Sequence, residues 1–327
     1  MNRYEYIVPD QIKEVFDYLD GTGTVIKAGG IDFLDLMKEN LASPQRLVNI
    51  RHLKELKFLK KAGDGSISIG PTVTLSDLAN DSNLPRSLRQ AADGAATPQI
   101  RNVATLGGNL CQRPRCWYFR NSEFKCARHG GDTCYALDGE NQYHAILGNQ
   151  DGCAIVQPSA TAVALTALDA QISIASANSS RMVNIDKFYI SPGQDITRET
   201  VMENGELVTE ILIPAGMKDY QTYYFKLKEK QSFDWPIADV AVSLRLEGKK
   251  CTDARIVLGS AAPVPWRSNE AEQYLRGKTV SKTTAREAGR MTMIAAQPLS
   301  QNGYKVEIFK TVVYRTICWA SGIDPLS

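Results

Sequence analysis

Cysteine is the residue type whose placement in this chain most directly suggests chemistry. Five of the seven cysteines fall between Cys111 and Cys153, in a polar stretch rich in Arg and Gly. In a reducing compartment, such a local cluster is typical of metal binding or catalysis rather than of a disulfide framework. Nine, seven and eighteen residues separate Cys116, Cys126, Cys134 and Cys153 in turn. Four thiolates suit a 4Fe-4S cluster or a structural zinc ion, and metal-free reduced thiols fit this spacing equally well.

Two segments with paired glycines could bind a phosphate. The segment KAGGID (27–32) follows a predicted strand and opens a predicted helix, with Asp32 placed to cap the first turn. Glycines let a diphosphate approach the backbone, and a helix start supplies N–H donors. The segment TLGGN (105–109) repeats the pairing among side chains that can bond a phosphate or a ribityl hydroxyl. Either segment alone also fits an ordinary turn, whereas the two together suggest one extended ligand.

Acid–base machinery is sparse by comparison. The chain has three histidines, and no Ser-His-Asp or Cys-His set stands out. His129 and His144 lie within the cysteine-rich stretch, where we expect hydrogen-bonded or solvated side chains rather than ligands. Features that hold cofactors without an evident proton-transfer residue favour an electron carrier over a hydrolase. We therefore predict no catalytic residue in the acid–base sense.

The expected organisation is two domains in 327 residues. We place an α+β domain at 1–217, interrupted by a cysteine-rich insertion at 111–153. A smaller domain at 218–327 should contain three antiparallel strands, at 222–228, 238–248 and 251–260, and helices around 268–276, 282–296 and 305–321. A loop as long as 111–153 is uncommon unless it is functional, and a metal would keep it ordered.

Composition excludes several classes of protein. Apolar residues make up 43% of the chain, charged residues 23%, and the formal net charge is +2. This balance is globular and gives no reason to expect nucleic-acid binding. No apolar run reaches the ~18 residues of a membrane span, and the charged N-terminus is unlike a secretory signal. We expect a cytoplasmic protein, with periplasmic export alongside a partner as the alternative.

At this point the motifs resemble those of a known family. IKAGGIDFLDLMK (26–38) and QIRNVATLGGNLCQRPRCWYF (99–119) are similar to the two FAD loops of the flavoprotein (medium) subunits in the xanthine dehydrogenase and carbon monoxide dehydrogenase family of molybdenum hydroxylases. FKLKEKQSFDWPIADVAVSL (225–244) and IVLGSAAPVPWR (256–267) resemble their small C-terminal domain. The resemblance implies FAD bound by Lys27, Ala28, Gly29, Gly30, Ile31, Asp32, Phe33, Thr105, Gly107, Gly108 and Asn109, with Lys226 near the flavin ring.

The cysteine-rich insertion is similar to that of a subgroup whose flavin subunit carries an additional 4Fe-4S cluster, represented by aldehyde oxidoreductases and 4-hydroxybenzoyl-CoA reductase. This resemblance implies Cys116, Cys126, Cys134 and Cys153 as ligands and leaves Cys111 out. It also implies a large molybdopterin-binding subunit and a small 2Fe-2S subunit as partners. Electrons would pass through the flavin between the 2Fe-2S clusters and an external acceptor.

Two positions depart from the family pattern. Many relatives have Thr where this chain has Ile31, and many have Asp where it has Ala160. Both changes remove a polar group and leave open whether FAD binds less tightly. They are also the support for the alternative hypothesis, a structural zinc-binding scaffold with a degenerate flavin site. The alternative interpretation of Lys226 is an ordinary surface lysine on a strand. The sequence does not fix the organic substrate, the acceptor (NAD, quinone, ferredoxin or oxygen), the direction of electron flow or the subunit stoichiometry.

Overall fold

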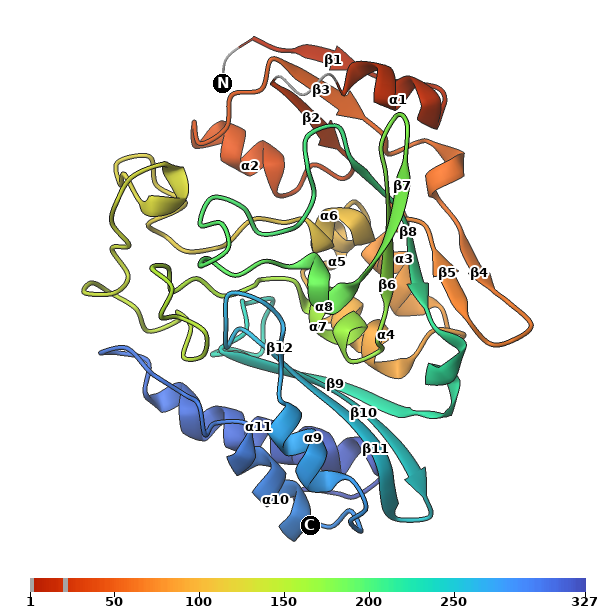
Figure 1. Cartoon of the computed structure of the whole chain (residues 1–327), viewed down its shortest axis with the longest axis vertical. Coiled ribbons are helices and arrows are strands. Elements are labelled where there is room, and N and C mark those ends of the chain that lie inside the picture. The colour runs from red at the N-terminus through yellow and green to blue at the C-terminus, as the bar shows by residue number, and fades with distance from the viewer. Residues whose placement is uncertain (1–2, 20–22) are drawn as a thin grey trace.

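The computed structural model describes residues 3–19 and 23–327, and within them the strands form three sheets (Figure 1). The first sheet is parallel, in the order β1-β3-β2, and β2 is followed by the first glycine segment. Because the carboxyl ends of parallel strands meet at one edge, the chain leaves β2 at an edge where ligands commonly bind. The elements here are β1(Glu5–Ile7), α1(Ile12–Tyr18), β2(Thr24–Lys27), α2(Phe33–Lys38), β3(Arg46–Asn49) and the 3-10 helix η1(Lys54–Leu56).

The second sheet is antiparallel, in the order β4-β5-β8-β6-β7, with helices packed against it. Every residue of α7 is buried, and its small apolar side chains belong to the core of this sheet, so the helix packs closely against its neighbours. The elements are β4(Leu59–Lys61), β5(Ile67–Ile69), α3(Leu75–Asn80), α4(Arg86–Asp93), α5(Pro98–Arg101), α6(Leu106–Leu110), α7(Ala160–Thr166), β6(Gln171–Ala175), β7(Ser180–Asn184), α8(Ile185–Phe188), β8(Leu207–Ile213) and η3(Ala215–Asp219).

The C-terminal sheet is antiparallel, and α9, α10 and α11 pack beside it (blue in Figure 1). The three predicted strands are present, and the structure adds a short fourth strand, β12, at the edge beside β11. Two residues give too short an alternation for sequence analysis to detect. The elements are β9(Gln221–Leu227), β10(Ala238–Glu247), β11(Lys250–Gly259), β12(Trp266–Arg267), α9(Asn269–Leu275), α10(Lys282–Met291) and α11(Tyr304–Ala320).

Residues 111–153 run as turns and loops around one short 3-10 helix, η2(Ala127–His129). Polar contacts hold this stretch to the rest of the molecule. Arg128 pairs with Glu199, and the backbone N–H groups of Ile146 and Leu147 both donate to Ala261 O, at 2.9 and 3.0 Å. The insertion therefore docks on both halves of the chain. None of the helices in the described part of the molecule is both long and apolar enough to cross a bilayer.

Candidate functional site

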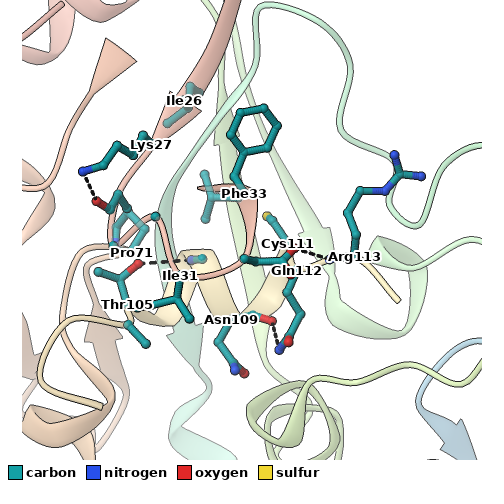
Figure 2. Close-up of a pocket in the computed structure, with 18 of the residues that line it drawn as sticks. Ile26, Lys27, Ile31, Phe33, Pro71, Thr105, Asn109, Cys111, Gln112 and Arg113 are labelled. Atoms are coloured by element: carbon teal, nitrogen blue, oxygen red, sulfur yellow. Dashed lines mark hydrogen bonds between the residues drawn. The ribbon is translucent and has the colours of Figure 1, made fainter. Parts of the chain in front are cut away.

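The two glycine segments line a single cavity of about 700 Å³, shown in Figure 2. All the side chains and loop positions expected from the sequence to hold a cofactor contribute to its wall. They are Lys27, Ala28, Gly29, Gly30, Ile31, Asp32, Phe33, Thr105, Gly107, Gly108, Asn109 and Lys226. The volume lies in the range typical of small-molecule and cofactor pockets.

The first glycine segment approaches the backbone just before the second segment, at 103–104, so closely that a side chain would not fit between them. A Cβ added to Gly29 would lie 2.4 Å from Val103 O, and Gly30 has a φ of +79°, a conformation that favours glycine. Within the described residues, the backbone N–H groups of Gly29, Gly30, Ile31 and Asp32 donate no hydrogen bond. These donors border the cavity and are available to an anionic ligand.

In the second segment, the backbone N–H groups of Gly107 and Gly108 already donate hydrogen bonds within the protein. Thr105 is the N-cap of α6 and accepts a hydrogen bond from Gly108 N at 3.2 Å. Gly107 N donates to Pro71 O at 2.8 Å, and a Cβ on Gly107 would lie 2.8 Å from the Pro71 side chain. The sequence prediction treated the two segments alike, whereas the structure leaves backbone donors free in the first and gives the second a shaping role.

Asn109 joins α6 to the start of α7. Its Oδ1 accepts hydrogen bonds from Ser159 Oγ at 2.7 Å and from Thr161 Oγ1 at 2.6 Å. Ser159 is also the N-cap of α7 and accepts from Ala162 N. Asn109 therefore fixes the relative position of two helices at the cavity wall.

Asp32 does not cap α2, which corrects the sequence-based expectation. The residue has helical φ and ψ values, and its side chain makes no capping bond. Its Oδ1 pairs with Arg115 at 2.9 Å and Arg120 at 2.6 Å, and its Oδ2 accepts from Arg113 N at 2.8 Å. Two guanidinium groups attract the carboxylate more strongly than neutral backbone donors do.

Lys226 extends from β9 into the cavity wall. Its Nζ donates to Gly94 O at 2.8 Å, and it faces Asp239 across the β9–β10 pair. Burial lowers its pKa to about 8, against the favourable effect of Asp239 on its charged form. Lys226 is therefore a partly buried residue whose ammonium group already has a partner, rather than a solvated surface lysine.

Several cavity residues were missed by sequence analysis. The loop just before β8, at 200–206, lines the cavity, and so do two exposed aromatic side chains, Phe233 (56% exposed) and Trp235 (52%). The Trp235 ring lies 4.7 Å from the Arg115 guanidinium. These residues come from loops without periodicity, and only their aromatic or apolar character in a polar setting could have indicated them.

The four predicted metal-binding cysteines line a second, smaller cavity. Cys116, Cys126, Cys134 and Cys153 share it with His144, while Cys111 lines the first cavity instead. All seven cysteines are free thiols. Across residues 3–19 and 23–327, no three or more His, Cys, Asp or Glu side chains are grouped as they would be around a metal ion. The thiols are thus gathered around a common space without converging on one point.

A buried polar chain runs from this smaller cavity into the C-terminal domain. His144 Nε2 lies 3.2 Å from Cys116 Sγ, and burial together with nearby Lys305 lowers the pKa of His144 to about 4. Lys305 donates to His144 O at 2.9 Å and to Ser260 O at 2.6 Å. Ser260 Oγ in turn donates to the buried Asp239 carboxylate at 2.8 Å. This series of hydrogen bonds joins the insertion to β10, where Asp239 lies opposite Lys226.

A cavity lined by backbone donors that are free within the described residues and by exposed aromatic side chains suits an extended, partly anionic, partly aromatic ligand. Comparison with known proteins identifies the family. Residues 2–216 match the family model described as the FAD binding domain in molybdopterin dehydrogenase, and residues 223–320 match the CO dehydrogenase flavoprotein C-terminal domain.

Individual relatives agree with this. The chain is 31% identical over 294 residues to the aldehyde oxidoreductase FAD-binding subunit PaoB of Escherichia coli K12, covering 88% of each chain. It is 25% identical to the xanthine dehydrogenase FAD-binding subunit of Escherichia coli O157:H7, over 91% of this chain and 89% of that one. Among solved structures, it resembles a chain of carbon monoxide dehydrogenase from Hydrogenophaga pseudoflava, with a TM-score of 0.75, 26% identity and 98% coverage of both chains.

The chain therefore belongs to the FAD-binding subunits of the molybdopterin-dependent dehydrogenases, the xanthine dehydrogenase and CO dehydrogenase family. It is an oxidoreductase subunit with an α+β, two-domain fold. The expectation of a flavoprotein of this family is confirmed.

Proposed function

We propose that this chain holds FAD in the 700 Å³ cavity and passes electrons between the 2Fe-2S clusters of a small partner subunit and an external acceptor. The observation that carries the proposal is the set of free N–H groups on Gly29, Gly30, Ile31 and Asp32 within the described residues. Backbone donors with no internal partner stabilise an anion such as a diphosphate. Bound FAD supplies one- and two-electron redox chemistry that the side chains alone lack.

The residues present fit this cofactor. The close contact of Gly29 with Val103 and of Gly107 with Pro71 shapes a channel that larger side chains would obstruct. Lys226 also lines the cavity, and its ammonium group would favour a negatively charged group beside it. We assign FAD contacts to residues 27–33, to Thr105, Gly107, Gly108 and Asn109, and to Lys226.

We further propose that Cys116, Cys126, Cys134 and Cys153 ligate a 4Fe-4S cluster. Their support is the shared cavity that they line and the chemistry of four thiols in one place. The alternative of a zinc-binding scaffold with an empty flavin site is not favoured, because the chain belongs to a family of FAD-binding subunits.

The partners follow from the same proposal. A large molybdopterin-binding subunit would oxidise the organic substrate, and a small 2Fe-2S subunit would connect it to this chain. The relatives named as FAD-binding subunits support a multi-subunit assembly. The division into domains 1–217 and 218–327, with the insertion at 111–153, and the cytoplasmic location stay predictions.

The ligand set is tested by comparing two cysteine variants. Replacing Cys126 by Ser removes one thiol of the smaller cavity and should lower the iron content of the purified protein at least several-fold. Cys111→Ser is the matched control, because Cys111 lies outside that cavity and should leave iron unchanged. Iron is measured per folded protein after anaerobic purification. Full iron in Cys126→Ser would remove this residue from the ligand set.

A further inference from the structure

The carboxylate of Asp32 connects the two cavities. It ends the first glycine segment, its side chain is 15% exposed, and its three bonding partners all belong to the insertion: Arg115, Arg120 and the backbone of Arg113. Both carboxylate oxygens are engaged. A carboxylate bonded in this way by cations is poorly placed to face a diphosphate, and acts instead on the loop that does.

The partners of Asp32 belong to a segment that serves both cavities. Arg113 and Arg115 line the larger cavity, and Cys116 lines the smaller one. Arg120 also holds the conformation of this segment, because it donates to Pro114 O at 2.8 Å and to Arg113 O at 3.1 Å. A displacement of this segment would therefore alter both cavities.

We propose that Asp32 is a positioning residue that couples FAD binding to retention of the group held by the four cysteines. The inference rests on the proposed function. Ordering of the insertion around the cysteine cavity places Arg115 and Arg120 against Asp32. The two ion pairs then hold the first glycine segment with its N–H groups toward the ligand. The free energy of coupling between two binding events is reciprocal, so bound FAD should stabilise the iron-loaded state through the same contacts. We expect this stabilisation to appear as slower extraction of iron.

The low exposure of Asp32 and its two arginine partners makes their ion pairs costly to break. The side chains of Asp32, Arg115 and Arg120 are 15%, 23% and 12% exposed, so water compensates poorly for a lost partner. Removing one member of such a pair leaves charge without its partner and costs more than the loss of an exposed ion pair. In a variant that lacks one member of the pair, this cost is reduced if the segment that carries Arg115 and Arg120 moves away from Asp32.

The test uses Asp32→Asn and, as a control, Asp186→Asn on the exposed surface of α8. Two quantities are measured on the purified full chain: the Kd for FAD after removal of flavin, and the rate at which a chelator extracts iron with and without saturating FAD. We expect Asp32→Asn to weaken FAD binding at least 10-fold and to abolish most of the protection of iron by FAD. The control should match the wild-type chain in both quantities.

A second variant guards against simple misfolding. Arg115→Gln should weaken FAD binding in the same direction. The double variant should be no worse than Asp32→Asn alone, because the Asp32–Arg115 ion pair is already lost in Asp32→Asn. Additive effects of the two changes would overturn the coupling. So would a normal FAD Kd in Asp32→Asn, or iron extraction that FAD does not slow in the wild-type chain. A wild-type chain that binds neither FAD nor iron would instead contradict the proposed function.

Discussion

Ile31 stands where the resemblance described in the sequence analysis implies a hydroxyl, and its side chain is 41% exposed at the cavity. The backbone N–H of the same residue is among the donors left free within the described chain. The substitution therefore removes one polar side chain while it leaves the backbone donors intact. Ala160, the second departure from the family pattern, lies in the first turn of α7 and also lines the cavity.

Gly29 gives a sharp test of the cavity at the residue scale. In Gly29→Ala the new Cβ would meet Val103 O at 2.4 Å, so either the first glycine segment or the backbone at Val103 must shift. We expect the Kd for FAD to rise at least 10-fold, equivalent to about 1.4 kcal/mol. Flavin fluorescence titration of the apoprotein measures this.

Gly63→Ala is the matched control, because a Cβ at Gly63 meets nothing within 4 Å among the described atoms. Its FAD affinity should equal that of the wild-type chain. An unchanged affinity in Gly29→Ala would show that the close contact of Gly29 with Val103 does not shape the binding site.

Asn109 tests the account at the scale of elements, because it holds α6 and α7 together. Asn109→Ala leaves the hydroxyls of Ser159 and Thr161, both buried, without their shared acceptor. We expect a loss of about 1–3 kcal/mol in the free energy of unfolding. The measurement is urea unfolding followed by circular dichroism.

Asn80→Ala serves as the comparison, since Asn80 is an exposed residue whose side chain donates to Ser76 O at the end of α3. It should cost less than 1 kcal/mol. Equal destabilisation by the two changes would mean that the α6–α7 connection contributes nothing beyond an ordinary surface hydrogen bond.

The elements show which parts of the structure could be predicted from sequence. Apolar residues indicated the strands β5, β10 and β11. Ile67 and Ile69 alternate in β5, whereas the first seven residues of β10 are all buried, so both faces of that strand are covered. The two glycine segments were located by residue type, and both line the cavity. The partners of Asp32 could not be predicted, since Arg115 and Arg120 lie more than eighty residues away and reach it through a loop without periodicity. The loop at 200–206 escaped notice for the same physical reason.

At the scale of the whole molecule, the insertion and the C-terminal domain meet at Lys305. This lysine is 1% exposed, and its Nζ donates to the carbonyls of His144 and Ser260. Burial lowers its pKa to about 7, from 10.5 in an unfolded chain, despite the nearby Asp239. Between these values the unfolded chain binds more protons than the folded chain, so this residue makes the free energy of unfolding rise with pH.

Lys305→Met should remove that dependence. From pH 7 to pH 10 the wild-type chain should gain stability relative to the variant, by roughly 1 kcal/mol per pH unit at most. Urea unfolding across this range measures the difference. Parallel stability curves would contradict a lowered pKa for Lys305.

The central claim concerns the cofactors, and the most direct test is an anaerobic absorption spectrum of the purified chain with flavin, iron and zinc quantified in the same sample. The account predicts a flavin band over a broad iron–sulfur shoulder, with about four irons per FAD. A colourless protein that contains zinc or no metal, and does not take up added FAD, would contradict the proposed electron-transfer function.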